Sequence, residues 1–273
     1  MTSDQPAHAG PVYRAAAWAS LAVMRAQRWQ FDVEGGEHVP RSGGAVIAAN
    51  HTSYWDFITV GRYPFLELGR PVRILAKESL FRAPIVGTVM RRAGHIPVRR
   101  GAGRVALGAA VDALRDGELI LVMPEQTISP AFDLLDIKQG PAHMARAAGV
   151  PLIPAVSWGS HRFHTIGRLP RLRWKLPVTV RFGRAVETDN GATPRQLTDV
   201  LTDRLRELLR TAQRDYPDGT PQGAWWVPAS LGGSAPTLDD ARVHLEALTE
   251  RWRHDRRRSR QRAASRRTRR TDV

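Results

Sequence analysis

Short apolar runs alternate with amphipathic stretches along most of this chain. Six apolar runs are typical of buried strands, at residues 30–33, 45–49, 72–76, 119–123, 151–156 and 178–182. Helical patterns lie between and after them, at residues 56–60, 86–92, 104–115, 141–148 and 194–214. Because strands and helices alternate, the pattern predicts an α/β fold with a mainly parallel mixed sheet flanked by helices.

The longest helix has the clearest signals. Thr193, Pro194 and Gln196 supply the N-cap, the first-turn proline and the capping-box partner of helix 194–214. The composition changes after Tyr216, where a loop rich in glycine and proline holds two adjacent tryptophans, and a last helix is expected over residues 237–253. We therefore expect an α/β domain at residues 29–216, a C-terminal extension at 217–253 and a tail at 254–273.

A further helix is expected at residues 12–28, after a polar start. Its apolar centre, residues 15–24, is shorter than the roughly 20 residues that span a hydrocarbon core. Two interpretations stay open. The segment is an amphipathic interfacial helix that immerses Trp18 and Leu21 in a membrane, or it packs on the domain.

The positive charge is concentrated at the C-terminus. The formal net charge is +15, and residues 251–273 hold eleven arginines against Asp255 and Asp272. Such a run predicts a disordered, solvated tail that is attracted to anionic lipid headgroups. Nonspecific RNA binding is the rival interpretation, but no nucleic-acid recognition module accompanies the tail, so no specific nucleic-acid partner is expected.

The cysteine and histidine content of the chain argues against several kinds of site. The chain has no cysteine, which excludes disulfides, a thiol nucleophile and thiolate metal sites. His161 and His164 have no carboxylates near them in the sequence and predict a loop feature rather than a zinc site.

The strongest candidate chemistry follows the strand at residues 45–49. Asn50 and His51 come directly after this strand, so His51 is expected at the carboxyl end, where open α/β sheets bind ligands. Asp56 lies about one turn further on and can hold one imidazole nitrogen while the other accepts a proton. Most pairs of this kind are structural, so the pair alone does not establish catalysis.

Three further segments give the pair a context. Asn50, His51 and Asp56 are followed in order by three other sets of matching residues: Gly94, Ile96 and Arg100; Pro124, Glu125, Thr127 and Ser129; Val150, Pro151 and Pro154. In order and spacing, these four blocks resemble those of the glycerolipid acyltransferases, in particular the 1-acylglycerol-3-phosphate acyltransferases. The resemblance covers roughly residues 12–185.

The resemblance implies a peripheral membrane enzyme on the cytoplasmic side of the cell membrane. It would move a fatty acyl group from acyl-CoA, or from an acyl carrier protein, to the sn-2 hydroxyl of a lysophosphatidic-acid-like acceptor. His51 would remove the hydroxyl proton and Asp56 would fix the imidazole tautomer, so neither a protein nucleophile nor a metal or bound cofactor is expected. The resemblance implies that Glu125 helps to bind the acceptor. Without the resemblance, the sequence equally allows Glu125 to form a buried ion pair with Arg99 or Arg100.

The third block departs from the family pattern. Its phenylalanine, glycine and arginine are replaced by Met123, Gln126 and Ile128. The arginine can fork onto a phosphate, so other groups must take this role if the acceptor is a phosphomonoester. The candidates are the basic residues Lys77, Arg99, Arg100 and Lys138, with hydroxyls or helix-start amides at Thr127 and Ser129.

Two alternatives to this function stay open. Another lysophospholipid or a polar lipid is an alternative acceptor within the same enzyme class. From a different class, the alternative is a noncatalytic basic protein that binds lipid or nucleic acid through its tail.

Overall fold

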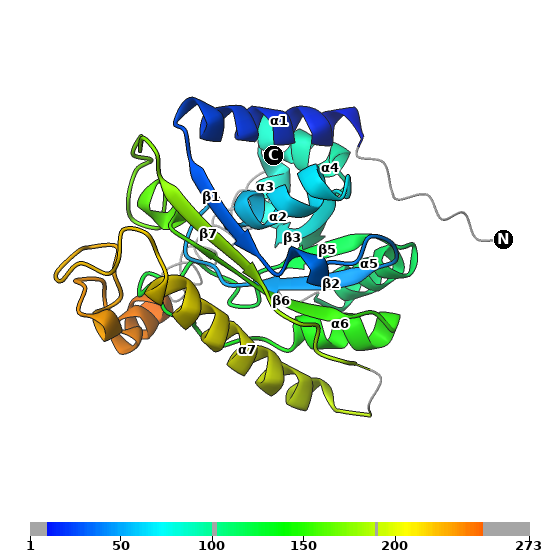
Figure 1. The fold of residues 1–273 in the computed structure, drawn as a ribbon. Helices are drawn as coiled ribbons and strands as arrows, with labels where there is room; N and C mark the ends of the chain where they lie inside the picture. Colours follow the sequence, from blue (N-terminus) through cyan, green and yellow to red (C-terminus); the bar gives the residue numbers. More distant parts are fainter. Residues whose placement is uncertain (1–9, 100–102, 189–190, 248–273) are drawn as a thin grey trace, which may run out of the picture.

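The computed structural model describes residues 10–99, 103–188 and 191–247, which surround one seven-stranded sheet (Figure 1). The strands are β1 (Gln30–Glu34), β2 (Ala45–Ala49), β3 (Val72–Lys77), β4 (Ile96–Val98), β5 (Leu119–Val122), β6 (Leu152–Trp158) and β7 (Pro177–Phe182). Their order is β1-β7-β6-β2-β5-β3-β4, and β6 with β7 is the antiparallel pair among parallel neighbours. The predicted mainly parallel mixed sheet is confirmed.

Helices cover both faces of this sheet (Figure 1). They are α1 (Pro11–Ala26), α2 (Asp56–Glu67), α3 (Glu78–Arg82), α4 (Pro84–Arg92), α5 (Gly103–Arg115), α6 (Gly140–Ala148) and α7 (Pro194–Arg214), and residues 238–247 are also helical. One apolar cluster joins the sheet to α5, α6 and α7, and a second joins it to α1 and α2. The central strands β2, β5 and β6 are fully buried, as their continuous apolar runs predict.

Two short elements were not predicted from the sequence. They are β4, which has three residues, and α3, which has five. Helix α2 also continues past the predicted end at residue 60, through Gly61 and Pro64, to Glu67. Both residues ordinarily break helices, but each is buried here against the rest of the domain, so tertiary packing overrides the local signal.

Helix α1 packs on the domain. Leu21 and Met24 are buried in the second cluster, and the Tyr13 hydroxyl accepts a hydrogen bond from the backbone N–H of Val72 at 3.1 Å. Trp18 contacts the Phe65 ring edge-on and is still 46% exposed. Among the described helices, none is long and apolar enough to cross a bilayer. Contact of α1 with a membrane surface stays a prediction.

The C-terminal expectations are only partly covered by the structure. Thr237 and Asp240 cap the last helix reciprocally, with the Asp240 N–H donating to the Thr237 hydroxyl at 3.1 Å. Residues 248–253 of this expected helix and the whole arginine tail, residues 254–273, lie outside the described residues.

Candidate active site

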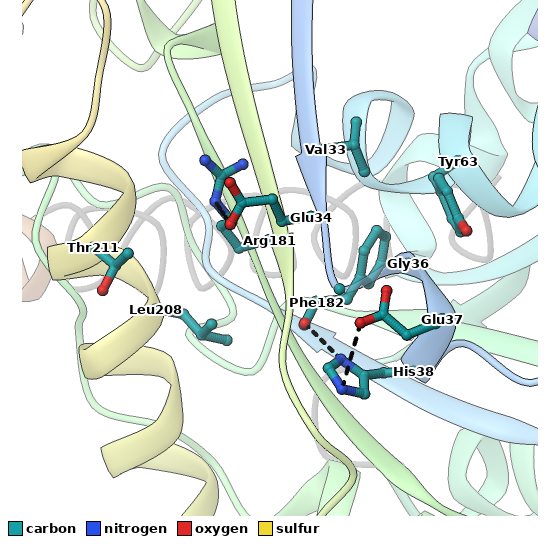
Figure 2. Close-up of a pocket in the computed structure, with 11 residues that line it drawn as sticks. Val33, Glu34, Gly36, Glu37, His38, Tyr63, Arg181, Phe182, Leu208 and Thr211 are labelled. Carbon is teal, nitrogen blue, oxygen red and sulfur yellow. Dashed lines mark hydrogen bonds and ion pairs between the residues drawn. The ribbon is translucent and has the colours of Figure 1, made fainter.

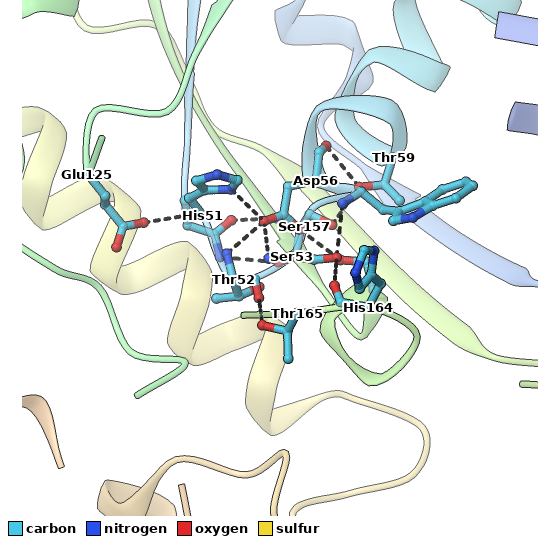
Figure 3. A network of polar contacts seen from close by, with 12 residues as sticks. His51, Thr52, Ser53, Asp56, Thr59, Glu125, Ser157, His164 and Thr165 are labelled. Carbon is cyan, nitrogen blue, oxygen red and sulfur yellow. Dashed lines mark hydrogen bonds and ion pairs between the residues drawn. The ribbon is translucent and has the colours of Figure 1, made fainter. Parts of the chain in front are cut away.

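His51 and Asp56 meet at the carboxyl end of β2 (Figure 3). His51 Nδ1 lies 3.2 Å from Asp56 Oδ2. The aspartate side chain is completely buried, whereas the histidine side chain is 20% exposed. The predicted pairing of a base with an orienting carboxylate is therefore present in the geometry.

Asp56 is held in place by donors from two segments of the chain. Its Oδ2 accepts hydrogen bonds from the backbone N–H groups of Thr52 and Ser53, both at 2.7 Å. Its Oδ1 accepts a hydrogen bond from the Ser160 hydroxyl at 2.7 Å. Because Asp56 is an acceptor in all of these contacts, it favours the His51 tautomer that carries its proton on Nδ1. The Nε2 atom is then left without a proton.

Glu125 holds the backbone of the same histidine. Its Oε1 accepts a hydrogen bond from the His51 N–H at 2.6 Å, and its Oε2 accepts one from the Leu135 N–H at 2.8 Å. The pKa of Glu125 is raised to about 8, mainly by burial and to a lesser extent by the nearby Asp56, whereas the two amide donors act in the opposite direction. The carboxyl group contacts backbone amides rather than Arg99, the described one of its two expected basic partners.

The loop that contains Glu125 also forms a hydrogen bond with the carbonyl group of His51. The Ser129 N–H donates to the His51 carbonyl oxygen at 2.7 Å, and the Ser129 hydroxyl donates to the carbonyl of Asp133 at 2.7 Å. Ser129 is buried and no helix begins between Thr127 and Ser129. The expectation that Ser129 offers a hydroxyl or a helix-start amide to phosphate is therefore wrong, because both groups hold the protein together.

A further layer of hydrogen bonds ties the turn after β2 to the segment after β6. The Ser53 hydroxyl donates to the His164 carbonyl at 2.7 Å, and the Thr165 hydroxyl donates to the Thr52 carbonyl at 2.6 Å (Figure 3). At the base of the turn, Asn50 exchanges two hydrogen bonds with the Ser157 backbone. No local pattern identified Ser160, His164 and Thr165 as neighbours of this turn, since more than 100 positions separate them from it along the chain.

The basic candidates lie around the same edge of the sheet. Lys77 ends β3 and Arg99 follows β4, and both strands run parallel to β2 within the sheet, so their carboxyl ends share its edge. Lys77, Arg99 and Lys138 are exposed and Thr127 is half-buried. The Lys138 N–H donates to the carbonyl of Pro124, the residue before Glu125, at 3.2 Å. Arg100 lies outside the described residues.

Ile128 occupies an interior position. It is 5% exposed, at the place where the resemblance expects an arginine. An apolar side chain suits this environment, whereas a guanidinium would need an anionic partner there. The change at Ile128 therefore lies in the interior, in the loop that contacts His51, whereas Gln126 of the same block is exposed.

His161 packs in the interior instead of joining the site. It is fully buried between Phe132 and Trp158, and its Nε2 lies 3.0 Å from the Trp226 carbonyl oxygen. Burial lowers its pKa to about 3, so it is neutral at ordinary pH. Trp226 is buried beside it, so this member of the tryptophan pair packs in the interior.

A pocket of about 610 Å³ lies elsewhere (Figure 2). Its lining includes Glu34, His38, Arg181 and Phe182. These residues lie at or just after the carboxyl ends of β1 and β7, which run antiparallel to β6 and therefore end at the opposite edge of the sheet from His51. The pocket is not the site formed by His51 and Asp56.

The chain is similar to proteins of known activity. Residues 30–158 match the family model described as Acyltransferase. A chloroplastic 1-acyl-sn-glycerol-3-phosphate acyltransferase of Arabidopsis thaliana is 29% identical over 154 residues, covering 55% of this chain and 41% of that protein. A lyso-ornithine lipid O-acyltransferase of Rhizobium meliloti is 28% identical over 224 residues, covering 71% of this chain and 73% of that protein.

A solved structure supports the fold. The 1-acyl-sn-glycerophosphate (LPA) acyltransferase of Thermotoga maritima superimposes with a TM-score of 0.63 at 22% identity, covering 75% of this chain and 80% of that one. Against three of the curated relatives, this chain spans only 41%, 43% and 56% of their lengths.

Proposed function

Since residues 30–158 of this chain belong to the acyltransferase family, we propose that the protein transfers a fatty acyl group from a thioester donor to the sn-2 hydroxyl of 1-acylglycerol 3-phosphate. The observation that carries this proposal is the orientation of His51. Its Nδ1 faces the buried Asp56 at 3.2 Å, and its partly exposed side chain leaves Nε2 for a substrate. This arrangement suits a general base.

The proposed reaction is a direct transfer. His51 Nε2 takes the proton of the acceptor hydroxyl as that oxygen attacks the thioester carbonyl carbon. The carbon–sulfur bond then breaks, and the imidazolium returns the proton to the departing thiolate. Asp56 stabilises the transient imidazolium, and Glu125 keeps the His51 backbone fixed while the proton moves.

The donor and the acceptor are proposed from the family. We propose acyl-CoA or an acyl carrier protein as the donor, with the acceptor phosphate held by Arg100, Lys77 and Lys138 and with Thr127 beside them. Glu125 was expected to bind the acceptor directly. Its two oxygens are engaged by backbone amides, so we propose that it acts on the acceptor through the position of His51.

A second acceptor is favoured by a specific observation. Ile128 is buried where the resemblance expects a phosphate-binding arginine. A relative of similar length is named for lyso-ornithine lipid. An acceptor of that kind is therefore the alternative to lysophosphatidic acid within the same reaction.

An acceptor panel tests the proposal. Thiol release from one acyl-CoA is measured with lysophosphatidic acid, with other lysophospholipids, with lyso-ornithine lipid and with no acceptor. We expect release that depends on the acceptor and is fastest with lysophosphatidic acid. Release fastest with lyso-ornithine lipid would select the alternative, and no release with any acceptor or donor would favour a noncatalytic lipid- or nucleic-acid-binding protein.

The proposal includes a peripheral position at the cytoplasmic side of the cell membrane. The acceptor carries an acyl chain that resides in a bilayer, and the arginine tail is suited to anionic headgroups. The charge of the tail alone gives an attraction that salt weakens.

A further inference from the structure

A loop beside the candidate site exposes large apolar side chains between cations. It runs over residues 166–175, between the segment after β6 and the start of β7. Leu169 and Leu172 are each 84% exposed and Trp174 is 62% exposed. The basic residues Arg168, Arg171, Arg173 and Lys175 alternate with them. Apolar side chains exposed together within a basic rim are typical of a surface that contacts a partner or a membrane.

The cations of this loop have no carboxylate within ion-pair distance among the described residues. Within the described parts of the chain, none of the four forms an ion pair with a carboxylate, whereas the adjacent Arg162 pairs with Asp218. Burial lowers the pKa of Arg173 and the like charges of Arg162 and Arg171 lower it further, whereas Tyr216 and Asp218 act in the opposite direction. An anion supplied from outside would relieve this repulsion.

The N-terminal end of the loop is hydrogen-bonded to the turn after β2 that follows His51. His164 and Thr165 immediately precede the loop, and they accept from Ser53 and donate to Thr52, respectively. The Arg171 N–H also donates to the Phe163 carbonyl at 2.8 Å, which folds the loop back on its own start. The exposed leucines therefore project from a base that is fixed relative to His51.

The second end is attached to the C-terminal end of α1. The Lys175 N–H donates to the Gln27 carbonyl at 2.8 Å, and the Arg173 N–H donates to the Gln27 side-chain oxygen at 3.0 Å. The Arg28 guanidinium lies over the Trp174 ring, 4.9 Å from its centroid. In Figure 1 the loop accordingly lies beside the end of α1 from which β1 departs.

We propose that residues 166–175 dock on the surface of an anionic lipid bilayer, with Leu169, Leu172 and Trp174 entering its apolar region and the interleaved cations contacting headgroup phosphates. This inference rests on the proposed function and goes beyond it, because it names the segment that holds the His51 turn at the membrane. A single docked loop with attachments at both ends would fix the depth of the turn relative to the lipid acceptor.

The loop differs in kind from the arginine tail. Residues 254–273 contain no leucine and no aromatic residue, so their attraction to lipid is electrostatic and is screened by salt. Immersed leucine and tryptophan side chains contribute by the hydrophobic effect, which salt does not screen. Vesicle binding at high salt therefore separates the apolar contacts proposed for the loop from the electrostatic attraction of the tail, and the leucine variant then assigns the apolar part to the loop.

The first experiment measures flotation of the full-length protein with vesicles of phosphatidylglycerol and phosphatidylcholine at about 0.1 M and about 1 M salt. We expect Leu169→Ser/Leu172→Ser to weaken binding at high salt about tenfold or more, since two immersed side chains are lost. Val200→Ser/Val243→Ser is the matched control, because both valines are exposed on other helices. Equal weakening in the control, or none in the leucine variant, would overturn the proposal.

The second experiment uses the absence of cysteine from the chain. Leu172→Cys and Val243→Cys each provide one thiol for an environment-sensitive fluorophore. We expect the emission to shift to the blue with vesicles for the label at position 172 and to stay unchanged at position 243. Vesicle binding during which the label at position 172 remains in water would overturn insertion of the loop.

The two proposals fail separately. His51→Ala should bind vesicles as the unchanged protein does, because its chemistry is not needed for docking. The leucine variant should keep thiol release with short-chain substrates that stay in solution. A protein that binds vesicles through the loop but transfers no acyl group would keep the docking proposal and end the proposed function.

Discussion

The turn around His51 lies at the same edge of the sheet as Lys77 and Lys138, two of the basic residues proposed for the acceptor, but the two regions are built in opposite ways. In the turn, three successive N–H groups, from His51 to Ser53, donate to the carboxyl groups of Glu125 and Asp56. Lys77 and Lys138, in contrast, are exposed. In the proposed mechanism, the fold therefore fixes the geometry of proton transfer, whereas acceptor selection would depend on exposed side chains that can change without disturbing the core.

The largest expected effect comes from removing the base in the turn. His51→Ala should lower kcat by about 10² to 10⁴, because general-base catalysis typically contributes that much. The measurement is acceptor-dependent thiol release, with the melting temperature verifying the fold. His143→Ala, an exposed histidine on α6, should keep full activity. Near-normal turnover of a folded His51→Ala protein would show that another group removes the proton.

A smaller loss is expected when the orienting carboxylate becomes an amide. In Asp56→Asn an NH₂ group replaces one of the two carboxylate oxygens. At Oδ2 it would face the N–H groups of Thr52 and Ser53, and at Oδ1 it would face the Ser160 hydroxyl, so one or two donors lose their acceptor. We expect about 10² lower kcat, since the tautomer of His51 is no longer set, and a loss of about 1 to 3 kcal/mol in the free energy of unfolding.

Kinetics and urea denaturation measure these two effects, and Asp199→Asn on the exposed side of α7 is the control. If Asp56→Asn were destabilised but catalytically normal, Asp56 would be a structural residue only.

The proposed role of the basic residues in binding the acceptor is tested by measuring the acceptor KM. Arg100→Ala should raise the acceptor KM roughly tenfold or more and leave the acyl-CoA KM nearly unchanged, since a charge-assisted pair is worth about 1.5 to 3 kcal/mol. Arg195→Ala, exposed on α7, is the control. An equal rise in both KM values, or no rise in either, would remove the phosphate role from Arg100.

The last prediction concerns the pH dependence of the free energy of unfolding. The folded pKa of Glu125 is raised to about 8 from its ordinary 4.5, so the folded state binds more protons than the unfolded state between these values. The contribution of Glu125 to the free energy of unfolding is fully present below pH 4.5 and is lost as the pH rises towards 8. The loss is on the order of a few kcal/mol. Urea denaturation of the protein and of Glu125→Gln across this interval isolates the carboxyl group; parallel profiles would mean that it is ionised throughout.

The sequence predicted the parts of the molecule that local patterns determine. The continuous apolar runs gave β2, β5 and β6, and the signals at Thr193 gave the start of α7, where the capping box is present. The family resemblance from the four blocks is confirmed by the match over residues 30–158. His51 and Asp56 were found because they lie five positions apart in a recognisable motif.

What the sequence missed depends on contacts between distant residues. Ser160 donates to Asp56 across 104 positions, and Thr165 donates to Thr52 across 113. No local pattern distinguishes such a serine or threonine from one in an ordinary loop. The same reason explains Ser129, which was expected to face a phosphate and is instead committed to His51 and Asp133.

The most direct test of direct transfer is the initial-velocity pattern with both substrates varied. If the hydroxyl oxygen attacks the thioester while both substrates are bound near His51, double-reciprocal plots against the acceptor at several acyl-CoA concentrations give intersecting lines, and acyl-CoA alone releases no thiol. Parallel lines, together with a burst of thiol release without acceptor, are the kinetic sign of an acyl-enzyme and would contradict the account.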